Sequence, residues 1–311
     1  MAYAENETCM KDLLTNLKEL FKDYGNNGSK GTTLSNIKTY KRGVISSTNT
    51  VYPVLICMPI REVIIQRRSD HTQIVERTVN VEIYTKSYSP ESSERVILDY
   101  EDKIRSIFYD SSYPNNYKLT EDDGRNTVIN FEIERYELLN DDQDVVQGLI
   151  VPIKYYSLED ANSYTISAQS ESTTKDIGDQ FRTVFKADSD LANVKFFFNN
   201  TIPPIPITSG SAICIKERSD LYRRYELGRD TETREFHIYV WTKLSPYEGS
   251  LDFHLDTVEN LKNTLHENTM WSGRSYYSYI DRIEHGINAQ KMMYGSEFTY
   301  VSNTYRVLPS Y

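Results

Sequence analysis

The residues of this chain that could do chemistry are five histidines, three cysteines and scattered carboxylates, and their spacing does not gather them. The histidines are His71, His237, His254, His266 and His285. None of them forms a His-x₃-His pair, and no Cys-x₂-Cys pair supplies further ligands, as a zinc site would require. The sequence therefore predicts no metal site and no cofactor site.

One group has the residue types of a metal-dependent nuclease centre. Asp70 precedes Glu82, and Lys86 follows on the same predicted strand. That chemistry needs a carboxylate and a lysine two residues apart on one face, whereas Glu82 and Lys86 are four apart. The chain also has no phosphate-binding glycine loop, dinucleotide fingerprint or nucleophile elbow. We interpret the group as a solvated strand face and predict no enzymatic activity. The alternative is a metal-dependent hydrolase or nuclease with an unrecognised site.

The elements that would position any site occur in two copies. Residues 77–87 and 234–244 both alternate apolar and polar side chains, as half-buried strands do, and lie 157 residues apart. The same shift relates Cys57 to Cys214, Arg61 to Arg218, Arg77 to Arg234, Lys86 to Lys243, and Asp99 to Asp256. One shift that relates several separate places is hard to obtain by chance, so the sequence predicts one domain present twice.

Each predicted copy runs helix, strand, hairpin, helix, hairpin. Apolar stripes at helical spacing cover residues 11–22 and 89–108 in the first copy, and 175–186 and 251–265 in the second. Strands are predicted over 37–40, 52–67, 77–87, 127–136 and 146–155, and over 194–197, 212–226, 233–244, 276–283 and 293–300. From Gly148 to Gly295 the shift falls to 147, which indicates a net insertion of ten residues within residues 111–126.

These elements predict an α+β fold. Sequential strands joined by short turns pair antiparallel, and two helices with one apolar stripe each must cover one face of a sheet. We expect two tandem copies of a two-layer α/β sandwich, each a mainly antiparallel sheet covered on one face by two helices. The first module spans residues 1–158, a Ser/Thr-rich linker spans 159–174, and the second module spans 175–311.

Charge and hydropathy exclude several classes of protein. The net charge is −10 with no basic block, so affinity for nucleic acid through phosphate contacts is not expected. A protein that lines a DNA passage without gripping it would also be acidic. No run approaches the roughly 18 apolar residues of a membrane span, and no secretory signal is expected. Cys57 and Cys214 are predicted to be buried small hydrophobes in a reducing compartment.

The charged positions shared by both copies are the candidate subunit-interface residues. They are Arg61, Arg218, Arg77, Arg234, Lys86, Lys243, Asp99 and Asp256. Two interpretations stay open: an ion pair between hairpin and helix within each copy, or contact with the equivalent surface of the next subunit. Gly148 and Gly295 are predicted to mark a bulge or a close approach of the backbone.

The strand that holds Glu82-Ile-Tyr-Thr-Lys86, followed by a capped helix and two more strands, resembles a known family. The order of elements is similar to that of phage tail-terminator and tail-completion proteins, over both halves of the chain, although that family has a single copy. The resemblance rests on element order and no diagnostic motif.

The resemblance implies a non-enzymatic structural protein of the virion, assembled in the host cytoplasm. Such a protein forms a homo-oligomeric ring at the neck or head-proximal end of a tail, as a tail terminator or head–tail connector. Its partners would be further copies of itself, neighbouring neck and tail proteins, and DNA that passes through the lumen without sequence-specific binding. A non-viral adaptor with two binding modules is the alternative.

Overall fold

The structure is a computed structural model that describes most of the 311 residues. Outside the description are residues 1–8, 45–49, 68–71, 87–89, 114–115, 117–118, 120–127, 140–145, 161–173, 199, 205–206, 208–209, 225–228, 245–247, 270, 272–274, 276 and 308–311. The chain divides into unit 1 (Met1–Gln66, Gln73–Glu159 and Ser245–Leu251) and unit 2 (Arg67–Thr72, Asp160–Leu244 and Asp252–Tyr311). Most of the predicted linker, together with His71 and Asp70, lies outside the described residues.

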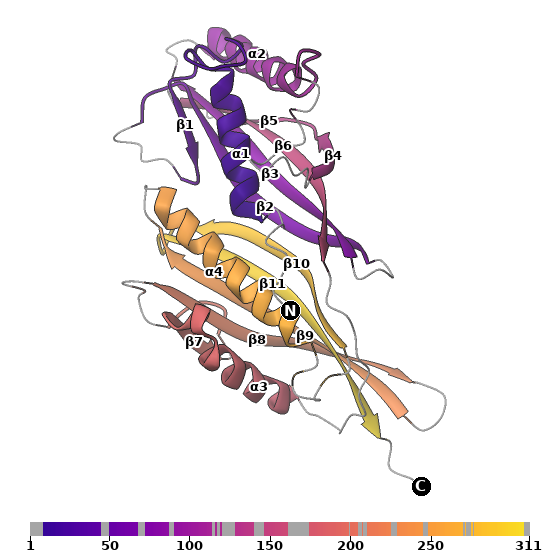
Figure 1. Ribbon diagram of the computed structural model, residues 1–311. Coiled ribbons are helices and arrows are strands. Elements are labelled where there is room, and N and C mark those ends of the chain that lie inside the picture. The colour runs from indigo at the N-terminus through magenta and orange to yellow at the C-terminus, as the bar shows by residue number, and fades with distance from the viewer. Residues whose placement is uncertain are drawn as a thin grey trace. The chain divides into compact units, whose positions relative to one another are not determined.

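Unit 1 contains two helices and a mixed sheet (Figure 1). Its elements are α1 (Met10–Asp23), β1 (Thr39–Arg42), β2 (Val54–Arg67), β3 (Thr72–Lys86), α2 (Pro90–Phe108), β4 (Val128–Ile133), β5 (Glu137–Leu139) and β6 (Val146–Asp160). The strand order is β4–β6–β3–β2–β1, and the short β5 continues the line of β4 along β6.

Unit 2 has the same strand order. Its elements are α3 (Thr174–Ala187), the 3₁₀ turn η2 (Ser189–Leu191), β7 (Val194–Phe198), β8 (Ser211–Arg224), β9 (Arg229–Lys243), α4 (Glu248–Glu267), β10 (Tyr277–Asn288) and β11 (Met293–Val307). The order is β10–β11–β9–β8–β7, which repeats unit 1 strand for strand. The fold class is therefore α+β, as predicted. Among the described helices, none is long and apolar enough to cross a membrane.

The sheets are mainly antiparallel, as predicted, and each unit adds one parallel pair. β1 pairs with β2 in parallel, and β7 pairs with β8 in parallel. Residues 43–53 and 199–210 connect these strands, and such connections are much longer than a hairpin turn. A long connection lets the chain return to the start of the neighbouring strand, which a parallel pair requires.

Strand register follows the shift of 147 residues at the closing hairpins. Ile133 lies opposite Ile153 in unit 1, and Ile280 lies opposite Tyr300 in unit 2. The opposing residues therefore keep their partners when both strands are shifted together. Side chains on the same face in one unit are on the same face in the other.

The predicted match of the first strands is shifted by two residues. Arg42 lies opposite Cys57 in unit 1, and Phe197 lies opposite Cys214 in unit 2. If Cys57 corresponds to Cys214, the counterpart of Phe197 is Arg42 and not Tyr40. Both cysteines are fully buried, as predicted for small hydrophobes.

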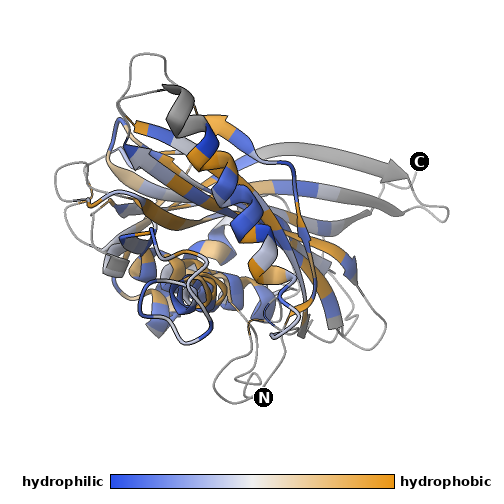
Figure 2. Cartoon of the chain, turned by 90° about the horizontal axis from the view of Figure 1, so that it is seen from above, coloured by the Kyte–Doolittle hydropathy of each residue, from blue (hydrophilic) through white to orange (hydrophobic). Residues whose placement is uncertain are grey.

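Most of the predicted helical stripes form the cores of the units. The stripe of α1 is buried at Leu13, Leu14, Leu17, Leu20 and Phe21, and that of α4 at Leu251, Leu255, Val258, Leu261 and Leu265. The stripe predicted for α2 consists of Val96, Ile97, Tyr100, Ile104, Ile107 and Phe108. All of these are buried except Val96, which is 46% exposed, so the prediction is wrong there. Hydrophobic and hydrophilic residues alternate along the strands, consistent with one covered face (Figure 2).

In unit 2, α3 and α4 contact the same face of the sheet. From α3, Phe181 makes edge-to-face ring contacts with Phe236 of β9 and Tyr300 of β11. From α4, His254 hydrogen-bonds to Thr242 of β9 and Ser296 of β11. Because alternate residues of a strand share a face, these contacts lie on one side. We call the opposite side, which carries His237, Tyr239 and Trp241, the open face of unit 2.

Candidate functional site

Two of the predicted interface residues are buried in the sheets. Arg77 is 1% exposed and Arg234 is 4% exposed. Arg77 Nε donates to Glu62 Oε2 at 3.0 Å, and its Nη1 donates to the Ser157 hydroxyl. A guanidinium at this depth holds the strands of its own unit together and leaves almost no surface for a neighbouring subunit.

The other predicted interface residues lie nearer the surface. Arg61 pairs with Glu76 across 3.1 Å, and Asp99 pairs with Lys103 within α2 at 2.6 Å. Lys86, Lys243 and Asp256 are exposed. Arg218 lies in β8, and its side chain is outside the described residues. Asp99 thus has a partner within its own helix, which differs from the predicted ion pair between hairpin and helix.

Glu82 and Lys86, from the group considered for nuclease chemistry, have separate partners, and Asp70 lies outside the described residues. Glu82 accepts a hydrogen bond from the Tyr84 hydroxyl at 2.8 Å, and burial raises the pKa of the Glu82 carboxyl. Lys86 lies over the ring of Tyr52, 5.4 Å from its centre. Within the described residues, no group of three or more His, Cys, Asp or Glu side chains could hold a metal ion.

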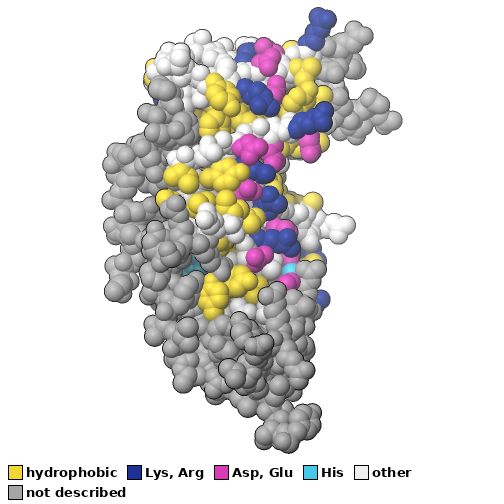
Figure 3. All heavy atoms as spheres, turned by 90° about the vertical axis from the view of Figure 1, so that its right-hand side faces the viewer, with side chains coloured by type: hydrophobic (Ala, Val, Ile, Leu, Met, Phe, Trp, Pro, Cys, Tyr) yellow, Lys and Arg dark blue, Asp and Glu magenta, His cyan; other side chains and the backbone are white. Residues whose placement is uncertain are grey.

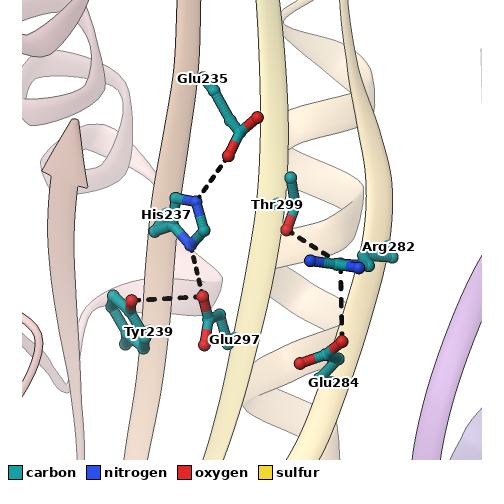
Figure 4. A network of polar contacts seen from close by, with 7 residues as sticks. All are labelled: Glu235, His237, Tyr239, Arg282, Glu284, Glu297 and Thr299. Carbon is teal, nitrogen blue, oxygen red and sulfur yellow. Dashed lines mark hydrogen bonds and ion pairs between the residues drawn. The ribbon is translucent and has the colours of Figure 1, made fainter. Parts of the chain in front are cut away.

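One group of polar residues that the structure gathers lies on the open face of unit 2 (Figure 4). His237 contacts Glu235 through Nε2 at 2.8 Å and Glu297 through Nδ1. The Tyr239 hydroxyl donates to Glu297 Oε1 at 3.2 Å. Beside them, Arg282 pairs with Glu284 at 3.6 Å. The sequence indicates that this face is polar, but it does not show that these residues contact one another across the strands.

These residues form cross-strand rows over β9, β11 and β10. His237, Thr299 and Arg282 make one row, Tyr239, Glu297 and Glu284 the next, and Trp241, Gly295 and Gly286 the third. The rows bring residues from three strands together because the register of each pair is fixed. A shift of one residue in either pair would move its partners to the opposite face.

A pocket of about 480 Å³ opens over the second and third rows. Tyr239, Trp241, Glu284, Gly286, Ile287, Gly295 and Glu297 are among the residues that line it. A Cβ atom built on Gly295 would lie 2.4 Å from Trp241 Cζ3, so glycine is required for the indole to lie across the strand. The Trp241 Nε1 donates to the Thr201 carbonyl at 2.8 Å, which fixes the ring.

Gly148 makes the same kind of contact in unit 1. A Cβ built on it would lie 2.9 Å from Tyr84 Cε1. The prediction of a close approach at Gly148 and Gly295 is therefore confirmed, and the approaching group in each unit is an aromatic ring from the neighbouring strand.

The helix-facing side of unit 2 holds a chain of buried polar side chains. Thr242 Oγ1 bonds to Ser211 Oγ at 2.7 Å and to His254 Nδ1 at 3.0 Å, and His254 Nε2 bonds to Ser296 Oγ at 2.7 Å. Ser296 in turn contacts His285 Nδ1 at 2.8 Å. Burial lowers the pKa of His254 to about 3, and His285 contributes in the same direction. The neutral imidazole of His254 is therefore enclosed in the core of unit 2.

One signal in the sequence could have located His254. It lies three residues after Leu251 and four before Val258, on the apolar stripe of its helix. A histidine on such a stripe must be buried and hydrogen-bonded.

No family model matches the chain, and no curated protein matches its sequence.

Proposed function

We propose that the chain consists of two tandem copies of a two-layer α/β sandwich and serves as a structural subunit of an oligomeric ring. The observation that carries the first part is the repeated framework. Both units have one strand order, one register at the closing hairpin, and one glycine–aromatic contact at equivalent places. In the ring proposal, the units of one chain offer similar surfaces, so that the first unit of a chain meets the second unit of the next.

The distribution of charge supports assembly through exposed residues. Lys86 and its counterpart Lys243 are exposed, as are Asp99 and its counterpart Asp256. Acidic and basic side chains are interspersed beside hydrophobic ones on the described surface (Figure 3). Repeated positions of opposite sign give complementary contacts between similar surfaces, which favour correct docking.

The proposed site of the ring is the neck or head-proximal end of a phage tail, around the DNA passage. The order of elements described for that family supports this location. The net charge of −10 fits a lumen that lets DNA pass without holding it. The partners would be neighbouring neck and tail proteins.

Light scattering on the purified full-length chain tests the proposal. We expect a mass that is a whole-number multiple of 36.2 kDa, and closed rings in electron micrographs. Lys243→Glu should weaken assembly, and more so at low salt, because it reverses an exposed repeated charge. Lys195→Glu, which changes an exposed lysine of β7 whose counterpart in unit 1 is Tyr40, is the matched control. A chain that stays monomeric at all concentrations and is absent from virions would refute the ring.

A further inference from the structure

Two residues that shape the open-face pocket of unit 2 differ from their counterparts in unit 1. Gly286 lies opposite Gly295 in unit 2, whereas Leu139 lies opposite Gly148 in unit 1. A Cβ on Gly148 would lie 3.3 Å from Leu139 Cβ, so the leucine occupies this space. A Cβ on Gly286 would meet nothing within 4 Å. The hollow exists because unit 2 has a glycine where unit 1 has a leucine.

The second difference concerns charge. Glu284 lies directly opposite Glu297 across β10 and β11, and both line the pocket. The corresponding pair in unit 1 is Glu137 opposite Ile150, where no second carboxylate is present. Like charges directly opposite in a sheet repel each other. Unit 2 therefore keeps two carboxylates side by side at a hollow that unit 1 fills with apolar groups.

The neighbouring groups leave part of this negative charge uncompensated. His237 and Tyr239 both contact the same oxygen of Glu297, Oε1, and no hydrogen bond among the described residues reaches Oε2. Arg282 lies 3.6 Å from Glu284, at the margin of an ion pair. Among the described residues, none that lines the pocket is a lysine or an arginine.

The walls of the pocket complete a site of definite chemistry. Trp241 and Tyr239 supply aromatic surface, and Gly286 leaves room for an alkyl chain beside it. An aromatic ring attracts a cation over its face, and carboxylates bind ammonium and guanidinium groups through charge-assisted hydrogen bonds. We propose that this pocket binds an alkylammonium or alkylguanidinium group. The occupant is either a free amine or the basic side chain of a second copy of the chain.

Ligand-observed saturation-transfer NMR with pentylammonium tests the proposal on the full-length chain, whatever its assembly state. We expect saturable binding with a dissociation constant on the order of 1 mM, as suits so small a ligand. Pentanol, which has the same length and no charge, should bind at least tenfold more weakly. Absence of saturable binding by pentylammonium, or equal binding of pentanol, would overturn the proposal.

Two variants copy unit 1 into unit 2. Gly286→Leu should abolish binding because it supplies the side chain of Leu139, and Glu297→Ile should weaken binding at least tenfold because it supplies that of Ile150. Gly178→Leu in α3 is the matched control, since a Cβ there also meets nothing within 4 Å and the position lies outside the pocket. Folding of each variant is checked by its unfolding midpoint. A folded Gly286→Leu protein that binds pentylammonium as the wild type does would overturn the proposal.

Sedimentation of the same proteins separates the two sources of the cation. If pentylammonium dissociates the wild-type assembly and Gly286→Leu fails to assemble, the occupant is a basic side chain of another copy. If binding saturates without any change in sedimentation, the occupant is a free amine. A monomeric chain that binds pentylammonium would refute the ring and support the pocket. Rings with no affinity for pentylammonium would support the ring and refute the pocket.

Discussion

Unit 1 and unit 2 fill the core beneath their second helices with different kinds of side chain. In unit 2, Ser211, His254 and Ser296 join Thr242 in a buried hydrogen-bonded chain. The counterparts in unit 1 are Val54, Ile97 and Leu149, which are fully buried and apolar. Only the threonine is common to both, as Thr85 and Thr242. The comparison teaches that strand register is the shared property, while either apolar packing or a satisfied polar network can fill the same space.

On the open face of unit 2 and the corresponding face of unit 1, the two units share one contact and differ beside it. Both units place an aromatic ring over a glycine, Tyr84 over Gly148 and Trp241 over Gly295. The adjoining strand then fills the space with Leu139 in unit 1 or leaves it open at Gly286 in unit 2. A change of one side chain on an unchanged backbone register is thus enough to separate a packed surface from a pocket.

The largest effect is expected at the buried ion pair between Arg77 and Glu62 of unit 1. Arg77→Met should lower the free energy of unfolding by about 3–5 kcal/mol, because it leaves the buried carboxylate of Glu62 without its main partner. Urea denaturation measures the loss. Arg61→Met, which breaks the less buried pair with Glu76, should cost at most about 1 kcal/mol. Similar losses of stability in both variants would contradict the burial of the Arg77–Glu62 pair.

The stability of unit 2 is expected to depend on pH through His254. The equivalent residue of unit 1 is Ile97, which does not titrate. The folded state keeps His254 neutral down to about pH 3, whereas the unfolded chain protonates it below about pH 6.5. The stability associated with the neutral ring is fully present above pH 6.5. It falls by up to about 1.4 kcal/mol for each pH unit below that value.

Urea midpoints at pH 7 and pH 4.5 measure this dependence. The wild type should lose about 2–3 kcal/mol more than His254→Gln over this range. His266→Gln, in the last turn of the same helix, is the control and should keep the wild-type dependence. An unchanged pH dependence in His254→Gln would contradict the conclusion that His254 is buried in its neutral form.

The shared threonine separates the two cores more directly. Thr242→Val should cost about 1–3 kcal/mol, because Ser211 and His254 both lose a buried partner. Thr85→Val should be neutral or stabilising, because the Thr85 hydroxyl is buried and has no hydrogen-bond partner among the described residues. Denaturation of the two variants in parallel gives the difference. Equal effects would mean that the polar chain of unit 2 contributes no more than the apolar core of unit 1.

The smallest effects concern the glycines of the open faces. Gly295→Ala should cost about 1–2 kcal/mol, since its Cβ would overlap the indole of Trp241. Gly148→Ala should cost less, because the nearest atom is the edge of the Tyr84 ring at 2.9 Å. Gly286→Ala should be close to neutral. Thermal unfolding ranks the three, and a large loss at Gly286 would show that the space beside it is already occupied.

The sequence predicts the elements well because each follows a local period. The stripe of α4 and the alternation of β9 need no tertiary information, and the repeat at Arg77 and Arg234 fixes which strands correspond. The parallel pairing of β1 with β2 could not be derived in the same way, because a connection of this length permits either direction.

The open-face site depends on information that no single strand carries. Glu284 and Glu297 lie on different strands, and only the register of β10 against β11 makes them neighbours. The sequence marks Gly295 through its match with Gly148, but it does not mark Gly286, whose counterpart is Leu139. The burial of Arg77 was missed for the same reason, since its partner Glu62 is 15 residues away on the neighbouring strand.

Cross-strand contacts measured by NMR on the closing hairpins test most directly the claim that the two units share one register. The account predicts Leu139 opposite Gly148 and Gly286 opposite Gly295, with Ile133 opposite Ile153 and Ile280 opposite Tyr300. A displacement of either unit's pairs by one residue would place its side chains on the opposite face and contradict the account.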